Sequence, residues 1–323
     1  SSKLLKLYQC FVDDRDMYPW GARQYRRARR LCTDFMSTVA SNNPKPQAST
    51  RITGWFTDWV SDWGELVISS CIALGDFCLF VLSTFRWMFS RIPRSETLWP
   101  NFYQVGVSSL PVVALTGTFI GVVLALQSSS QLGHYGLTNQ LGGVINLTLV
   151  RELGPVLAAT MLAGRVGSAM AAELGTMRVT EQIDALSAMG ADPIHYLVVP
   201  RFLACLLFIP TLTIMADFMG VAGGYFYSNI WLNIDQHYYW TNSAKFVNNF
   251  DLFTGILKSL FFGSAISLIS CYQGFNCKPG AEGVGKAATS SFVFAFIVIL
   301  ILDLSLGLSL KALYESWYPG VTY

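Results

Sequence analysis

Two adjacent charged residues, Arg151 and Glu152, interrupt an apolar stretch that is long enough to cross a membrane. A charge at bilayer depth costs about 3 kcal/mol or more, so such residues usually face protein or a water-filled cavity. Adjacent helix positions point about 100° apart, so each side chain needs a partner other than its neighbour. An arginine binds the phosphate of a phospholipid bidentately. The alternative is a structural pair with a charge on another span, for which Asp217, Lys258 and Asp303 are available.

The same stretch continues into an amphipathic segment, residues 176–195, which is too polar to span a membrane yet lies between two spans. It places Ile183, Leu186 and Met189 on one side of a helix, a spacing with which helices dock in a partner's groove. A helix lying on the membrane would look similar, but anionic lipids would repel acidic residues such as Glu181. A span that faces substrate and continues into a partner-binding segment indicates a transport subunit whose energy comes from a separate protein.

The composition is that of an integral membrane protein. Of 323 residues, 52% are hydrophobic and 13% are charged, against about 25% charged in a soluble domain. A net charge of +2 indicates no nucleic-acid partner for the chain as a whole. The seven cysteines show no CxxC spacing and are expected to be reduced thiols. Three scattered histidines give no metal-ligand pattern, and no catalytic residue is expected.

The fold class we predict is all-α and integral to the membrane. About 20 apolar residues cross a bilayer, and five segments meet that length. The predicted spans lie near 103–128, 141–174, 197–228, 253–275 and 287–313. The preceding segment, 55–89, carries three tryptophans at four-residue spacing, which is typical of the headgroup boundary. We expect it to be an interfacial amphipathic helix, with a true span as the alternative.

Loop charge predicts the topology. Lysine and arginine gather in loops 86–102, 175–196 and 276–286, whereas loops 129–140 and 229–252 contain a single lysine. The positive-inside rule puts the first set, and therefore the segment at 176–195, in the cytoplasm.

The N-terminal extension, residues 1–54, is basic and is expected to be cytoplasmic and partly disordered. Nine of the 22 lysines and arginines lie in the first fifty residues. A patch for anionic lipid or nucleic acid is the alternative. No signal peptide is visible, so the first span is expected to act as its own insertion signal.

One motif suggests nucleotide binding but fails in detail. Gly280 to Lys286 reads GAEGVGK, which fits the phosphate-loop spacing, but Ala287 follows where Ser or Thr should hold Mg²⁺. The segment before it is a predicted span instead of a strand. We therefore expect no cofactor in this chain, and ATP and Mg²⁺ in a partner ATPase.

A family resemblance rests on three stretches. RELGPVLAATMLAGRVGSAMAAELGTMRVTEQIDALSAMGADPIHYLVVPR, beginning at Arg151, resembles the MlaE (YrbE) permeases, the membrane subunits of Mce-associated ABC lipid transporters. GFNCKPGAEGVGKAATSSFV and LILDLSL, near the C-terminus, are similar to the same family. The resemblance covers roughly residues 55–313, and a permease domain is therefore expected over 55–323, after the extension 1–54.

The resemblance implies the partners and the function. It implies a homodimer with two cytoplasmic ABC ATPases and an Mce-domain (MlaD-like) hexamer on the outer side. It also implies that phospholipids or related lipids move between an inner membrane and an outer envelope, without enzymatic activity in this chain. The expected location is a bacterial inner membrane, with the plastid inner envelope as the alternative.

Site residues are carried over from the same resemblance. The lipid-binding cavity it implies comprises Leu124, Leu132, Tyr135, Arg151 and Glu152. Thr176 to Pro193 match the cytoplasmic coupling helix between the second and third spans, which seats in the ATPase. Its candidate contact residues are Arg178, Glu181, Gln182, Ala185, Leu186, Met189, Asp192 and Pro193.

Two functions of other classes remain open from the residues alone. An ion-coupled secondary transporter could use the intramembrane carboxylates Asp217, Glu152 and Asp303 as proton or ion sites. An intramembrane lipid enzyme would need a nucleophile with a base, a carboxylate pair or a metal cluster, and no such spacing is visible.

Overall fold

The structure is a computed structural model that describes residues 53–90, 95–136, 140–232 and 234–317, and all regular elements in these ranges are helical. The predicted basic extension, 1–54, thus lies almost entirely outside the described residues. Residues 71–323 form one compact unit, which begins within the first described helix.

The helices follow one another with short connections. The N-terminal part contains α3 (Thr53–Ser90), α4 (Ser95–Val105), the 3-10 turn η2 (Val107–Ser109) and α5 (Leu110–His134). The middle contains α6 (Leu141–Thr148), η4 (Leu149–Leu153), α7 (Gly154–Leu162), η5 (Ala163–Gly167), α8 (Ser168–Val179), α9 (Gln182–Ala188) and η6 (Ile194–Val198). The C-terminal part contains α10 (Val199–Ile230), α11 (Gln236–Phe246), α12 (Asn249–Phe275) and α13 (Ala281–Trp317).

Six helical stretches of the described residues are long and apolar enough to cross a membrane. They are Cys71–Phe89, Glu96–His134, Leu141–Val179, Ile194–Ile230, Asn249–Phe275 and Ala281–Tyr314. The last five contain the predicted spans, which confirms a multi-pass helical protein. The first lies inside the segment predicted to be interfacial, so length and composition alone allow six spans as well as five.

The second half of α3 packs against residues near the ends of other helices. Phe77 and Phe80 pack edge-on against Tyr272, near the end of α12. Phe85 packs against Phe202, near the start of α10, and Trp87 lies 5.5 Å from the ring of His195 in η6. All these partners lie at the end of the bundle that carries α9, as expected for a helix that crosses the ends of the spans.

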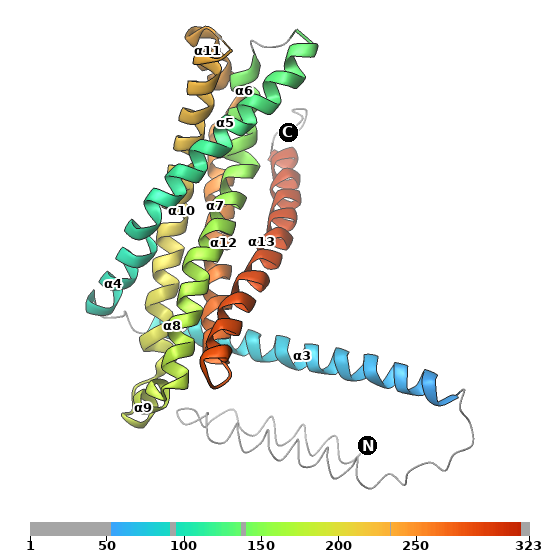
Figure 1. The fold of residues 1–323 in the computed structure, drawn as a ribbon, viewed down its shortest axis with the longest axis vertical. Coiled ribbons are helices and arrows are strands. Elements are labelled where there is room, and N and C mark those ends of the chain that lie inside the picture. The colour runs from blue at the N-terminus through green and yellow to red at the C-terminus, as the bar shows by residue number, and fades with distance from the viewer. Residues whose placement is uncertain (1–52, 91–94, 137–139, 233, 318–323) are drawn as a thin grey trace. The chain divides into compact units, whose positions relative to one another are not determined.

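The bundle is built on close approach of α5 and α10, which pack together extensively (Figure 1). A Cβ atom on Gly121 would lie 1.9 Å from the carbonyl oxygen of Gly220, so only glycine allows the two backbones to meet here. Small residues commonly permit such contacts between membrane helices. A small-residue stripe on the second span is used in the same way, because Gly167 lies against Ser270 of α12.

The second span is helical from Leu141 to Val179 but contains two π-helical segments. η4 and η5 each widen the helix by one residue per turn, and such segments are frequent at functional sites. Pro155 is the second residue after η4, and its missing N–H leaves a backbone acceptor free of its usual partner. Both π segments carry charged residues.

The two ends of the bundle differ in character. Figure 1 shows α9 at one end of this unit and α11 at the other. The aromatic segment 229–252, predicted to lie at the outer interface, contains helix α11, whose Tyr239 donates a hydrogen bond to Asn146 of α6 at 3.3 Å. Burial raises the pKa of Tyr239 to about 12, since an apolar environment disfavours the phenolate.

Candidate functional site

The charged pair lies on the π-helical segment η4. Arg151 and Glu152 turn to different neighbours, as their adjacent positions predict. Each residue therefore has a partner other than its neighbour. For Glu152 the partner is Lys258, one of the charges named in the structural alternative.

Glu152 belongs to a three-residue network that joins three helical segments. The ammonium group of Lys258, on α12, lies 2.6 Å from Oε2 of Glu152 and 3.0 Å from Oδ1 of Asp303, on α13. The Lys258 side chain has no exposed surface, whereas 46% of the Glu152 side chain is exposed. A fully buried ammonium group requires paired carboxylates, and removing one partner of a buried pair costs about 3–5 kcal/mol.

Arg151 faces a different carboxylate. Its Nε lies 3.9 Å from Oδ1 of Asp251, which is buried at the start of α12. The other oxygen of Asp251 accepts the backbone N–H of Asn248 at 2.9 Å and closes a capping box. The cap holds the carboxylate in place, so Arg151 meets a fixed anion.

A cavity of about 490 Å³ opens beside these residues, between the second span and α13. Its lining combines apolar and charged side chains. The lining residues are Leu147, Thr148, Arg151, Glu152, Asp303, Leu304, Gly307, Leu308 and Lys311. Ligand sites commonly pair an apolar wall with a few polar groups that orient the ligand. This arrangement can hold an amphipathic molecule, with its polar part at the charges.

The other predicted cavity residues lie elsewhere on this chain. Leu124 and Leu132, on α5, are half-buried against a small cluster formed by Ala125, Leu141 and Ile145. Tyr135 follows α5 and is 80% exposed. None of the three lines the 490 Å³ cavity of the single chain, and their role in lipid binding stays a prediction.

The predicted coupling segment is divided into short pieces. The second span runs on to Val179, and Glu181 then takes a left-handed backbone conformation with φ of 59°. The helix α9 that follows has seven residues, so one continuous amphipathic helix over 176–195 is wrong. The break arises because a non-glycine residue with positive φ cannot continue a right-handed helix.

The predicted contact residues of this segment lie on both of its sides. Glu181, Gln182, Ala185 and Met189 are exposed, and Met189 is 74% exposed. Ile183, by contrast, is buried in the core of its own chain, and Leu186 packs against that core. The remaining three candidates are partly buried. Arg178 pairs with Asp184 at 2.8 Å, Asp192 accepts the backbone N–H of Ile194, and Pro193 precedes η6.

Sequence reasoning missed two charged residues of this site. Asp251 has the signature of a helix cap, which conceals its second role opposite Arg151. Lys311 lies within the last predicted span, 287–313, but it was not considered for charge pairing. Its spacing of eight residues from Asp303 places both on one helix face, and that was the available signal.

The third carboxylate considered for ion transport lies apart from this network. Asp217, on α10, contacts Gly154 so closely that a Cβ there would lie 1.7 Å from its Oδ1. That oxygen is buried and has no hydrogen-bond partner among the described residues. Glu152 and Asp303 both bind Lys258 instead, so the three carboxylates do not form one cluster.

Sites for metals or nucleotides do not emerge from the described part of the chain. Within it, no group of three or more His, Cys, Asp or Glu side chains could hold a metal ion. The GAEGVGK segment forms a turn at Gly280, with φ of 96°, and the first turns of α13. It follows helix α12, and a phosphate loop follows a strand.

Comparison with known proteins gives a consistent result. A family model described as Permease MlaE matches residues 98–308, about two thirds of the chain. A probable ABC transporter permease protein of Rickettsia prowazekii is 44% identical over 215 residues, covering 64% of this chain and 83% of its own. The intermembrane phospholipid transport system permease protein MlaE of Haemophilus influenzae is 38% identical over 239 residues, which cover 73% of this chain and 91% of that protein. The chloroplastic protein TRIGALACTOSYLDIACYLGLYCEROL 1 of Arabidopsis thaliana is 40% identical over 207 residues, with coverages of 63% and 59%.

The helical bundle and these relatives define a class, the multi-pass permease subunit of an ABC transporter. Such subunits are not enzymes themselves, and they imply a separate ATPase. The chain belongs to the MlaE permease family.

Proposed function

We propose that this chain moves phospholipids or related lipids between an inner membrane and an outer envelope, powered by a cytoplasmic ABC ATPase. The observation that carries the proposal is the cavity of about 490 Å³ with Arg151 and Glu152 at its wall. Its apolar residues suit acyl chains, and Arg151 suits a phosphate. The name of the Haemophilus relative, a phospholipid transport permease, supports the same substrate class.

The surface that we propose to bind the ATPase is the exposed side of α9 together with the turn before it. Glu181, Gln182, Ala185 and Met189 project from the end of the second span. The same span carries Arg151 and Glu152, so a movement of α9 is transmitted along α8 and α7 to the cavity. ATP and Mg²⁺ belong to the ATPase in this scheme.

The proposed assembly follows the family resemblance. Two copies of this chain form a dimer, two ATPases bind on the cytoplasmic side, and an Mce-domain hexamer binds on the outer side. A bacterial inner membrane is the proposed location, and the plastid inner envelope is the alternative, because one relative is named chloroplastic. Native mass spectrometry of the complex purified in mild detergent tests the subunit composition, and a single copy of this chain per complex would contradict the dimer.

A reconstituted transfer assay tests the function. The complex is placed in donor vesicles, and the ATP-dependent arrival of labelled phospholipid in acceptors is measured. Arg151→Ala should abolish transfer while the complex remains assembled, because it removes the phosphate partner and leaves the Lys258 network intact. Lys245→Ala, which removes an exposed basic residue of α11, is the matched control. Unchanged transfer by the Arg151 variant would refute the cavity assignment.

A binding assay tests the contact with the ATPase. Glu181→Lys reverses an exposed charge next to α9 and should release the ATPase in a pull-down. Lys245→Glu, a charge reversal at the opposite end of the bundle, should leave binding unchanged. Retention of the ATPase by the Glu181 variant would count against this contact surface.

A further inference from the structure

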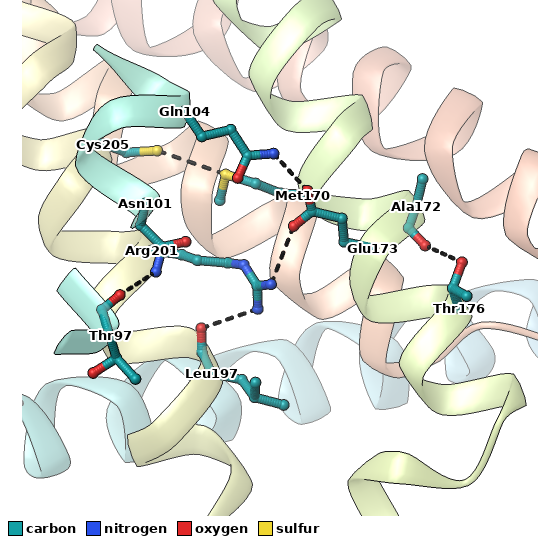
Figure 2. Close-up of polar contacts among 10 residues, drawn as sticks. All are labelled: Thr97, Asn101, Gln104, Met170, Ala172, Glu173, Thr176, Leu197, Arg201 and Cys205. Atoms are coloured by element: carbon teal, nitrogen blue, oxygen red, sulfur yellow. Dashed lines mark hydrogen bonds and ion pairs between the residues drawn. The ribbon is translucent and has the colours of Figure 1, made fainter. Parts of the chain in front are cut away.

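Glu173, on α8, binds two other helices with its two carboxylate oxygens. Figure 2 shows its side chain between Gln104 and Arg201. Oε1 accepts a hydrogen bond from the side-chain amide of Gln104, on α4. Oε2 accepts one from Nη2 of Arg201, on α10, at 3.2 Å. We propose that this group of three residues, the Glu173 clamp, positions α4, α8 and α10 so that movement of α9 reaches the first and third spans.

The position of the clamp around α9 is the first argument. Glu173 lies six residues before the end of α8, and Arg201 is the third residue of α10. The turn, α9 and η6 all lie between these two residues. The ion pair therefore joins the two ends of the segment between Glu173 and Arg201, which contains α9. A force applied to α9 acts on α8 at one end of this segment and on α10 at the other.

The surroundings of Arg201 are the second argument. Its side chain is 8% exposed, and its Nη1 donates to the carbonyl oxygen of Leu197 at 3.2 Å. Its Nε has no hydrogen-bond partner in the described part of the chain. Leu197 belongs to η6, the π-helical segment that joins α9 to α10. Arg201 thus binds the connector with one nitrogen and α8 with another. Since burying a guanidinium group is costly unless it is paired, Glu173 decides where the side chain rests.

Gln104 extends the clamp to the entrance of the first span. It lies at the end of α4, which packs on α10 through Phe102 and Phe208, with ring centroids 5.2 Å apart. A Cβ on Gly106, two residues after Gln104, would lie 2.5 Å from the Phe208 ring. The junction of α4 with the first span is therefore tightly packed and follows α10 and Glu173 when they move.

The polar nature of the clamp is the third argument. The Arg201 side chain is buried, whereas 39% of the Glu173 side chain is exposed. Exposed ion pairs add little to stability, and apolar residues in place of buried charges are often neutral or stabilising, so stability alone does not require this pair. Directional bonds give a defined relative position to three helices, which apolar contacts do not. The other hydrogen bonds that Figure 2 draws near the clamp stay within one helix, such as Asn101 to the carbonyl oxygen of Thr97 at 2.7 Å, and the Cys205 thiol makes only a weak contact with Sδ of Met170 at 3.8 Å.

The test measures how tightly lipid transfer is coupled to ATP hydrolysis. The clamp proposal rests on the proposed function. The complete complex with its ATPase is reconstituted, and both ATP hydrolysis and lipid transfer are recorded for each variant. Glu173→Gln should lower the number of lipids transferred per ATP by about tenfold, the effect of one lost charge-assisted hydrogen bond, while hydrolysis continues. Glu96→Gln, which removes an exposed carboxylate from α4, should leave the ratio unchanged.

A charge swap keeps the test independent of folding. Glu173→Arg should uncouple the complex, and Glu173→Arg combined with Arg201→Glu should restore the ratio, because the ion pair re-forms and Gln104 can accept from an arginine. The contrary result is that transfer and hydrolysis fall in step with the amount of assembled complex, and that the charge swap restores neither the number of lipids transferred per ATP nor the assembly. The clamp would then have only a structural role, and the proposal would be overturned. Failure of the unmodified complex to transfer lipid would instead overturn the proposed function.

Discussion

The fully buried ammonium group of Lys258 forms an ion pair with Glu152, with 2.6 Å between the nitrogen and the carboxylate oxygen. The pair links α12 to the π-helical segment of the second span, and Asp303 adds α13 to the same ammonium group. Three helices are therefore joined beside the cavity through one side chain with no exposed surface.

Replacing Lys258 should destabilise the protein strongly. Lys258→Ala leaves Glu152 and Asp303 close together without their shared cation, and we expect a loss of about 3–5 kcal/mol. Thermal unfolding of the purified protein in detergent measures it. Lys258→Met together with Glu152→Gln and Asp303→Asn should recover much of this stability, since no charge is then left unpaired. An unstable triple variant would show that the charges themselves support the fold.

The approach of α5 and α10 depends on Gly121. Gly121→Ala should lower stability by about 1–3 kcal/mol, the range for overpacking, because the new methyl group would meet the backbone of Gly220. Gly133→Ala, on the same helix, meets nothing within 4 Å and is the control. Equal melting temperatures for the two variants would contradict the close helix contact.

Gly154 provides space for the Asp217 carboxylate just after η4. Gly154→Ala should reduce the yield of folded protein, because its Cβ would lie 1.7 Å from Oδ1 of Asp217. Asp217→Ala should be tolerated and should partly rescue the Gly154 variant when the two are combined. The fraction of monodisperse protein in size-exclusion chromatography measures the effect. A double variant no better than Gly154→Ala alone would argue against this contact.

The end of the bundle that carries α11 should lose stability at high pH through Tyr239. Its pKa is raised to about 12 in the folded protein, against about 10 when unfolded. The unfolded state therefore loses the proton first, and stability falls as the pH rises from about 10 towards 12. Thermal unfolding of the native protein and Tyr239→Phe over this pH range measures it. The difference in melting temperature between the native protein and Tyr239→Phe should shrink as the pH rises. A constant difference would contradict a raised pKa for Tyr239.

Hydropathy predicted much of the fold because membrane spans are defined by length and apolarity, which a single chain displays directly. It left α3 undecided, since Cys71–Phe89 satisfies the same criterion as a span. The π-helical segments η4 and η5 were not predicted, because they arise from a shift of hydrogen-bond partner that residue types do not encode. Glu181 was not recognised as the break before α9, since glutamate rarely adopts positive φ.

The site was predicted in part for a similar reason. Arg151 and Glu152 stood out because charge in an apolar span is conspicuous. Asp251 did not, because at a helix start it has the expected role of a cap. Glu173 and Arg201 lie 28 residues apart, near the ends of their spans where charge is ordinary, and only the folded chain brings them together.

Photo-crosslinking shows whether the cavity beside Arg151 holds lipid. A photoreactive amino acid is placed at Thr148, an exposed residue of the cavity wall, and in a control at Lys245. After irradiation of the assembled complex in phospholipid vesicles, the attached molecules are identified by mass spectrometry. The account predicts phospholipid attached at position 148, reduced when Arg151→Ala is introduced, and little change at position 245. Equal lipid attachment at both positions, unaffected by Arg151→Ala, would contradict a lipid-binding cavity at this site.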